Sequence, residues 1–235
     1  MMPALKKWLQ KIVFAENANQ ETLLKYLKKN GASIGEDVHL FSFRKTHIDT
    51  LNPHLLTIGN HVNIVASTIL THDYAWSVIK GKYGEILGNQ RPVSIGNNVF
   101  IGDGSIILAG SIIEDDIIIG ARSVVSGRLE SGFVYAGNPA KKIMSVDDYR
   151  TKRKKGQFDE ARCFVKMYYE RLGTIPQKEL LHEYFFLFER DIEQMPKLFK
   201  HRLTQCGTYD LSKSVLLNNE PLFKDYDEFI KACFE

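Results

Sequence analysis

The sequence predicts a mainly β protein in which short parallel strands stack into a coil, with helices before and after it. Three observations support this prediction: an aliphatic residue returns every six positions through the middle of the chain, glycines accompany it, and helical spacing is confined to the two ends. The clearest run is Ile95, Ile101, Ile107, Ile113, Ile119 and Val125, and glycine directly follows three of these residues, at Gly96, Gly102 and Gly120.

A period of six fits a coil with three flat sides. Six extended residues cover about 20 Å, so three sides close a triangular turn of about 18 residues, stacked about 4.8 Å above the previous turn. The repeated aliphatic residue fills the interior, and glycine suits the corner, where a positive φ or a close backbone approach would penalise a side chain. Interrupted at Thr46 and Asn52, the same frame continues upstream through Ile34, Leu40, Ile58, Ile64 and Leu70.

Helical patterns flank the coil, which occupies residues 31–144. Residues 1–30 are predicted to form an N-terminal helical cap, with a short amphipathic helix over residues 1–15 and a second helix that begins at Asn19 and has an apolar face. Ser145 and Asp148 occupy capping-box positions ahead of an α-helical extension over residues 145–235, whose first helix is expected to end at Gly156.

The regular frame breaks once in the middle of the coil. From Leu70 to Ile95 is 25 residues, one more than a multiple of six, so the two regular blocks cannot join without an insertion. Residues 71–92 are rich in glycine and polar residues and are predicted to leave the coil as a loop. His72 lies where this loop begins, and a reactive group is most useful where a loop overhangs a neighbouring surface. His72 is therefore the candidate catalytic residue.

Composition narrows the class of protein. The 235 residues carry a formal net charge of only +3, which argues against a dedicated nucleic-acid binder. The longest apolar stretches are far shorter than the roughly 18 residues of a membrane span, so we expect a cytoplasmic protein without stable membrane insertion. Cys163, Cys206 and Cys233 lack the paired spacing typical of a disulfide framework or a zinc site.

Three segments in a fixed order carry a resemblance to a known family. "ILTHDY", then "PVSIGNNVFIGDGSII", then "VYAGNPAKKI" resemble the acetyltransferase branch of the hexapeptide-repeat, left-handed parallel β-helix family, which includes maltose, galactoside, xenobiotic and capsular-polysaccharide acetyltransferases. The resemblance covers residues 31–144. It implies direct transfer of acetyl from acetyl-CoA to an acceptor hydroxyl, with His72 as general base, and a homotrimer with CoA grooves between subunits.

The residues beside His72 supply further site candidates, and the resemblance implies the contacts to CoA. Asp73 or another nearby carboxylate is a candidate to fix the tautomer of His72; Asp73 is equally a candidate to brace the loop, and the residues leave both roles open. Tyr74 and Trp76 are candidates to stack on a sugar ring. The expected contacts to CoA are Asp103, Ala121, Ser126, Gly127, Lys141 and Lys142, with the two lysines facing its 3′-phosphate. Gly127 lacks the charge usual in relatives, and Asp103 departs from the usual small residue, which leaves only its backbone.

The expected activity is acetyl-CoA-dependent O-acetylation of a saccharide, in modification of a surface or capsular polysaccharide. An amino-sugar N-acetyltransferase would need nearly the same residues, and a non-catalytic scaffold could share the coil. A zinc carbonic anhydrase on this scaffold needs three convergent histidines, and the spacings of 8, 7, 7 and 11 among His39, His47, His54, His61 and His72 argue against it. We therefore expect no metal.

Overall fold

The computed structural model describes residues 19–235, so the helix predicted over residues 1–15 lies outside the described residues. The chain divides into two compact units, with the division between Tyr149 and Arg150. The predicted boundary after residue 144 falls within the last strand of the first unit, β17 (Lys141–Ser145). Each unit is described by itself below.

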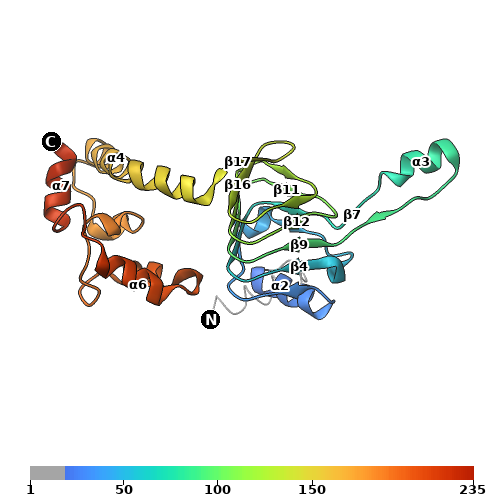
Figure 1. The fold of residues 1–235 in the computed structure, drawn as a ribbon, viewed down its shortest axis with the longest axis horizontal. Helices are drawn as coiled ribbons and strands as arrows, with labels where there is room; N and C mark the ends of the chain where they lie inside the picture. The colour runs from blue at the N-terminus through green and yellow to red at the C-terminus, as the bar shows by residue number, and fades with distance from the viewer. Residues whose placement is uncertain (1–18) are drawn as a thin grey trace. The chain divides into compact units, whose positions relative to one another are not determined.

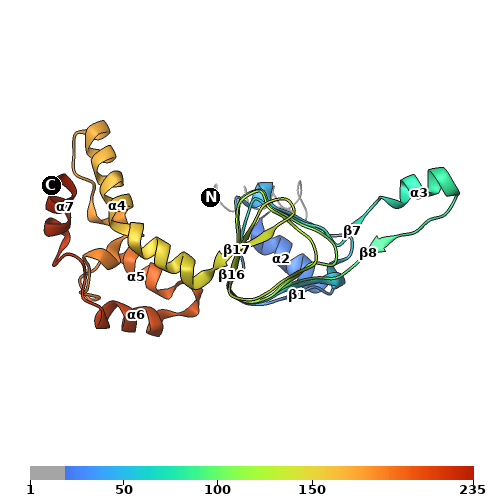
Figure 2. The same cartoon turned by 45° about the horizontal axis from the view of Figure 1, so that its top comes forward.

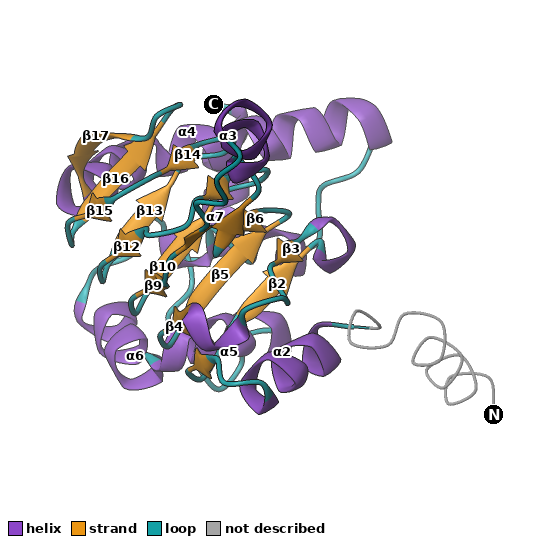
Figure 3. Cartoon of the chain, turned by 90° about the vertical axis from the view of Figure 1, so that its right-hand side faces the viewer, coloured by secondary structure: helices purple, strands orange, loops and turns teal. Residues whose placement is uncertain are grey.

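The first unit is a left-handed parallel β-helix with three sides (Figures 1 and 2). Each side is a sheet in which strands of successive coils pair in parallel, and Figure 3 shows one of them nearly face on. Sheet A contains β1 (Ser33–Ile34), β4 (Leu56–Ile58), β9 (Val93–Ile95), β12 (Ile112–Ile113) and β15 (Arg128–Leu129). Sheet B contains β2 (His39–Phe41), β5 (Val62–Val65), β10 (Val99–Ile101), β13 (Ile117–Ile119), β16 (Phe133–Ala136) and the antiparallel β17. Sheet C contains β3 (His47–Ile48), β6 (Thr68–Ile69), β11 (Ile106–Ile107) and β14 (Val124–Val125).

The repeated aliphatic residues fill the interior, as the period of six predicts. Ile95 pairs with Ile113, Ile101 with Ile119, and Ile107 with Val125, in each case 18 residues later. All six side chains are at most 1% exposed. Burial of one such side chain is worth about 1.5–3 kcal/mol, so the stacked aliphatic columns are the main source of stability in this unit.

The upstream part of the predicted frame is wrong at Leu70, and its interruption at Thr46 has a structural cause. Ile48 and Ile69 fill the interior of sheet C, where the frame placed Thr46 and Leu70. The first coil is longer than the others because it includes two short 3₁₀ helices, η2 (Phe43–Lys45) and η3 (Pro53–Leu55). These helices absorb the extra residues of the first coil, whereas Ile69 is displaced because the turn between β5 and β6 is one residue shorter than the equivalent turn between β10 and β11. Strand pairing therefore fixes the register where sequence spacing could not.

The glycines that follow the aliphatic residues are required by close backbone approach. A Cβ on Gly59 would lie 2.6 Å from the carbonyl oxygen of Gly96 in the next coil. The positive φ values of this corner fall two residues later, at Asp37, His61, Asn98 and Asp116. Of the two reasons considered for glycine at this corner, close approach is the one that the structure supports.

Helix α2 (Gln20–Lys29) covers the first coil. Asn19 caps it, since its side-chain oxygen accepts a hydrogen bond from the backbone N–H of Thr22 at 2.9 Å. Leu23 and Leu27 are buried in the same core as the interior column. Gln20 pairs with the backbone of the edge strand β2: its amide donates to the carbonyl of Val38, and its oxygen accepts from the N–H of Leu40. The helix therefore protects an otherwise open sheet edge.

The insertion forms an arm with its own secondary structure, where the sequence predicted a loop. Strands β7 (His72–Asp73) and β8 (Asn89–Gln90) pair as an antiparallel ribbon, and α3 (Trp76–Tyr83) lies beyond them (Figure 1). The helix ends at Gly84, which adopts a positive φ of 79°. No residue of α3 is buried, and the arm exposes Val78, Ile86 and Leu87.

The second unit is helical. Helix α4 (Val146–Leu172) starts in the first unit with the predicted capping box, in which Ser145 Oγ accepts from the backbone N–H of Asp148 at 3.0 Å. It continues through Gly156, where the sequence predicted its end. The remaining helices are η4 (Lys178–Leu181), η5 (Phe185–Leu187), α5 (Lys197–Thr204), η6 (Gln205–Gly207), α6 (Tyr209–Asn218) and α7 (Tyr226–Phe234). Phe185, Phe199 and Phe229 are buried in its core. Within residues 19–235, no helix combines the length and hydropathy needed to cross a membrane.

Candidate active site

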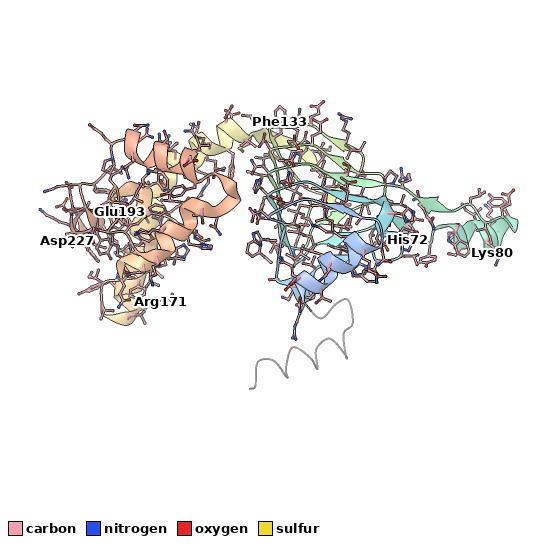
Figure 4. All side chains as sticks on the ribbon, turned by 90° about the horizontal axis from the view of Figure 1, so that it is seen from below. His72, Lys80, Phe133, Arg171, Glu193 and Asp227 are labelled. Atoms are coloured by element: carbon pink, nitrogen blue, oxygen red, sulfur yellow. The ribbon has the colours of Figure 1, made fainter. Side chains whose placement is uncertain are left out.

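His72 lies at the corner where the chain leaves sheet C for the arm (Figure 4). We call this the C/A corner, because regular coils turn there from sheet C to sheet A. Leu70 still belongs to the coil, since its backbone N–H donates to the carbonyl of Ile107 at 2.9 Å. Two residues later the imidazole of His72 is half-buried, with 17% of its side chain exposed. The predicted position of His72, at the base of the insertion, is the one observed.

A buried carboxylate contacts the imidazole from the coil below. Nδ1 of His72 lies 2.5 Å from Oδ2 of Asp49, which is only 4% exposed. Asp49 follows β3 directly, and its backbone N–H donates to the carbonyl of Ile69 at 3.0 Å. The pairing of β3 with β6 therefore brings together two residues that are 23 positions apart in sequence. The sequence allows a nearby carboxylate other than Asp73 to orient the ring but does not identify Asp49; its only signal is a carboxylate directly after an interior aliphatic residue near the break of the frame.

Other donors hold the Asp49 carboxylate in its ionised form. Oδ2 accepts from the hydroxyl of Thr71 at 2.5 Å and from the Thr71 backbone N–H at 3.1 Å, and Oδ1 accepts from the N–H of Leu51 at 2.9 Å. Burial by itself would raise the pKa of Asp49, but the hydrogen bonds from Thr71, Leu51 and His72 outweigh it and lower the pKa. A carboxylate accepts hydrogen bonds and cannot donate them, so it favours the tautomer that carries the proton on Nδ1. The second ring nitrogen, Nε2, then keeps its lone pair and can take a proton.

Two aromatic side chains of the arm follow the imidazole in series. The Tyr74 ring meets the His72 ring edge to face, with centroids 5.2 Å apart, and Trp76 lies 6.1 Å beyond Tyr74. Tyr74 is 62% exposed. Of the two rings predicted to stack on a sugar, Tyr74 therefore contacts the histidine and is strongly exposed, and Trp76 contacts Tyr74.

Asp73 forms its hydrogen bonds within the arm and not with the imidazole of His72. Its carboxylate accepts from the N–H of Ala75 at 2.9 Å and from the side-chain amide of Asn89 on the opposite strand. These two hydrogen bonds, the first named being the larger effect, lower the pKa of Asp73. Of the two roles left open for Asp73, this geometry supports bracing the arm, and Asp49 occupies the position that orients the ring.

Four of the predicted contacts to CoA lie on the two corners that flank sheet C. Ser126 and Gly127 follow β14 at the C/A corner, which is the corner of His72. Asp103 and Ala121 lie at the opposite corner, between sheets B and C, in neighbouring coils linked by a hydrogen bond from the N–H of Arg122 to the carbonyl of Asp103 at 2.8 Å. All four residues are exposed.

The two predicted lysines differ in their surroundings. Nζ of Lys142 lies 2.7 Å from the carboxylate of Glu130 and 3.6 Å from the centre of the Phe133 ring. The hydrogen bond to Glu130 raises the pKa of Lys142. Lys141 is exposed on the same strand and makes no salt bridge with any residue in the described range 19–235. Lys141 is therefore the better placed of the two to meet a phosphate.

A second pair of contacts between histidine and aspartate lies away from this site, at the corner between sheets A and B. Asp37 accepts from His39 at 2.7 Å and from His61 at 2.9 Å, all three side chains being substantially exposed. The hydrogen bond from His61, despite partial burial, lowers the pKa of Asp37. In the portion of the chain that the structure covers, no cluster of three or more His, Cys, Asp or Glu side chains has metal-binding geometry.

Comparison with known proteins places the β-helix in a family. Residues 92–127 match the family model of the bacterial transferase hexapeptide (six repeats). The chain is 40% identical over 127 residues to Protein CapG of Staphylococcus aureus, a match that covers 54% of this chain and 73% of that protein. It is 30% identical over 121 residues to galactoside O-acetyltransferase of Escherichia coli (strain K12), covering 49% of this chain and 58% of that enzyme. The crystal structure of a maltose O-acetyltransferase from Clostridium difficile 630 superimposes with a TM-score of 0.44 at 21% identity, over 60% of this chain and 83% of that one.

Proposed function

Since the chain belongs to the hexapeptide-repeat acetyltransferase family, we propose that it transfers an acetyl group from acetyl-CoA to a hydroxyl group of a saccharide, with His72 as the general base. The observation that carries this proposal is the contact of His72 Nδ1 with buried Asp49, which leaves Nε2 able to accept a proton. The name of one relative, galactoside O-acetyltransferase, supports a saccharide acceptor.

The proposed reaction is one direct displacement. Nε2 of His72 removes the proton of the acceptor hydroxyl while the hydroxyl oxygen attacks the thioester carbonyl of acetyl-CoA. The tetrahedral intermediate collapses, the C–S bond breaks, and the imidazolium returns its proton to the CoA thiolate. Asp49 stabilises the imidazolium without taking its proton, because a carboxylate with a lowered pKa remains ionised. A backbone N–H at a coil corner is the expected donor to the oxyanion.

The arm supplies the acceptor side of the proposed site. Tyr74 is in van der Waals range of His72 and strongly exposed, so a sugar ring stacked on it would lie close to Nε2. Apolar ring faces of saccharides pack well on aromatic rings, and Trp76 extends the same wall. Tyr74 and Trp76 are therefore proposed to bind the acceptor.

The corners that flank sheet C supply the proposed CoA side. Ser126 and Gly127, on the His72 corner, and Asp103 and Ala121, on the other, are proposed to contact the pantetheine arm through their backbone groups, with Lys141 and Lys142 toward the 3′-phosphate. We also propose a homotrimer, in which a neighbouring subunit completes each groove, and a cytoplasmic role in modification of a surface or capsular polysaccharide.

The test is an assay of CoA release against a panel of sugars and amino sugars. We expect His72→Ala to lower kcat by about 10²–10⁴-fold while CoA binding and thermal stability stay close to wild type. His39→Ala is a matched control, because His39 also contacts an aspartate but lies at another corner. Unchanged turnover in His72→Ala would refute the mechanism, and a lack of acetyl-CoA binding by calorimetry would favour a non-catalytic scaffold. Preferred turnover of amino sugars would point to N-acetyl transfer.

A further inference from the structure

The arm carries an arginine, Arg91, that the protein holds in place through hydrogen bonds of its side chain and its backbone. In the β7–β8 ribbon, alternate side chains face opposite sides, so Asp73, Asn89 and Arg91 share the face opposite His72. Asn89 donates to Asp73 through its amide nitrogen, and its oxygen accepts from Nε of Arg91 at 2.9 Å. Asp73 acts on Arg91 only through space. Among residues 19–235, no carboxylate forms a salt bridge with Arg91.

The backbone of Arg91 is fixed where the arm rejoins the coil. Its N–H donates to the carbonyl of Thr71, the residue before His72, at 2.9 Å. The carbonyl of the next residue, Pro92, accepts from the N–H of Gly110 at 3.1 Å. Arg91 is therefore tied on one side to the strand of the proposed base and on the other to the coil above it.

The side chain of Arg91 lies back over the C/A corner. A Cβ on Gly110 would meet Nη1 of Arg91 at 2.9 Å and its Cζ at 3.0 Å, so the guanidinium lies across the bare backbone of that glycine. Gly110 has a φ of +86°, which also favours glycine there. Ser126 and Gly127, which are proposed CoA contacts, follow the strand of the next coil at this same corner.

One edge of the guanidinium is left for a ligand. With Nε engaged by Asn89, the edge formed by Nη1 and Nη2 keeps two N–H groups in a plane, which matches two oxygens of a carboxylate or phosphate. Arginine normally loses rotamer freedom when it binds, but Asn89 and the Gly110 surface already restrict this side chain. The arrangement also gives Asp73 a role, because it orients the Asn89 amide that orients Arg91.

We propose that Arg91 binds an oxyanion of one of the two reactants at the edge of the active site, an inference that rests on the proposed acetyl transfer. Two sources offer this chemistry: a carboxylate or phosphate of the acceptor, as in a uronic acid or a nucleotide sugar, or the phosphates of acetyl-CoA. In either case Arg91 determines binding of the charged reactant and takes no part in bond making, so its loss changes KM and leaves kcat nearly constant.

The experiment compares Arg91→Gln, Arg91→Lys and Asn89→Ala with Lys80→Gln, a control that removes one positive charge from helix α3 of the same arm (Figure 4). KM is measured for galactose, galacturonate, UDP-galactose and acetyl-CoA. Arg91→Gln should raise KM about 10-fold for the anionic acceptors or for acetyl-CoA, with kcat within about twofold. Arg91→Lys should recover only part of the loss, since it restores charge without the fork, and Asn89→Ala should fall between. Lys80→Gln should match wild type.

The pattern of KM changes identifies the source of the anion. A KM increase confined to galacturonate and UDP-galactose indicates the acceptor, and a KM increase confined to acetyl-CoA indicates the donor. Equal KM values in Arg91→Gln and wild type for all four compounds would refute the role of Arg91 while acetyl transfer stands. If wild type acetylates no sugar, the proposed function fails separately. Calorimetry with galacturonate, UDP and acetyl-CoA then decides on Arg91: weaker binding of one of them to Arg91→Gln supports it, and equal binding of all three refutes it.

Discussion

Replacing Asp49 with asparagine removes a negative charge behind His72 while keeping the size of the side chain. Asp49 accepts from Leu51 on Oδ1 and from Thr71 and His72 on Oδ2, so both of its oxygens face backbone N–H groups. An asparagine amide must turn its NH₂ toward one of these two sides. In the first orientation the NH₂ group points toward Leu51, and the N–H of Leu51 loses its acceptor. In the second orientation the NH₂ group points toward Thr71 and His72; the N–H of Thr71 then loses its acceptor, and Nδ1 of His72 must accept a hydrogen bond.

Each orientation leaves one backbone donor without its partner, which costs about 1–3 kcal/mol for a buried donor. The Thr71 N–H is buried and the Leu51 N–H is only partly buried, so the first orientation costs less. In the second orientation the proton of His72 moves to Nε2, and the ring can no longer act as the base. In the first orientation the ring keeps its tautomer but loses the charge that stabilises the imidazolium. Together these effects should raise the activation barrier by about 3–4 kcal/mol, which lowers kcat by about 10²–10³-fold.

The assay is kcat, measured as CoA release with the best acceptor, together with the KM for acetyl-CoA. Asp49→Asn should lower kcat and leave this KM close to wild type, because Asp49 contacts the proposed base. A general structural role for Asp49 would instead change kcat, the KM for acetyl-CoA and thermal stability together. Asp37→Asn is the matched control, because Asp37 contacts two histidines elsewhere on the same β-helix, and its activity should equal wild type. A folded Asp49→Asn enzyme with wild-type kcat would refute the proposed orientation of the base.

Three further predictions follow from packing and charge. Gly59→Ala should lower the free energy of unfolding by about 1–3 kcal/mol in chemical denaturation, because its Cβ would lie 2.6 Å from a carbonyl oxygen of the next coil, whereas Gly81→Ala, with open space around it, should not destabilise the protein. The free energy of unfolding of wild type should fall as the pH drops below the ordinary Asp value of 3.8, since the pKa of Asp49 is lowered in the folded state; an equally steep fall in Asp49→Asn would contradict this. Lys141→Ala should weaken binding of acetyl-CoA, and reduce the salt dependence of that binding, more than Lys142→Ala does, because Lys142 is paired with Glu130. Calorimetry at two salt concentrations measures both effects, and a larger effect of Lys142→Ala would count against the assignment.

Sequence alone predicted much of this protein because the β-helix repeats a local rule. An interior aliphatic residue every six positions, at Ile95, Ile101 and their successors, determined the coil. The interruption of that rule located the arm and the position of His72, and the family motifs indicated acetyl transfer. These features depend on residues that are close together in the chain, so their spacing can be read directly.

The structure decided the features that depend on coil length. A 3₁₀ helix ahead of β3 makes Ile48 the interior residue of sheet C in the first coil, and a turn one residue shorter between β5 and β6 makes it Ile69 in the second, so the frame predicted from spacing slipped there. Helix α4 passes through Gly156, which shows that one glycine inside a strong helical pattern does not end a helix that its neighbours continue.

The residues that surround His72 in the candidate site could not be predicted from the sequence either. The position of His72 in the sequence made it a candidate. Asp49 lies 23 residues earlier and Arg91 lies at the end of the inserted arm, and strand pairing brings both close to the His72 strand. The sequence by itself determined the coil and the place where it opens, because both follow from a short repeat. Which charged groups meet at that opening was decided by tertiary structure, because hydrogen-bond register between coils joins residues whose separation varies with every insertion.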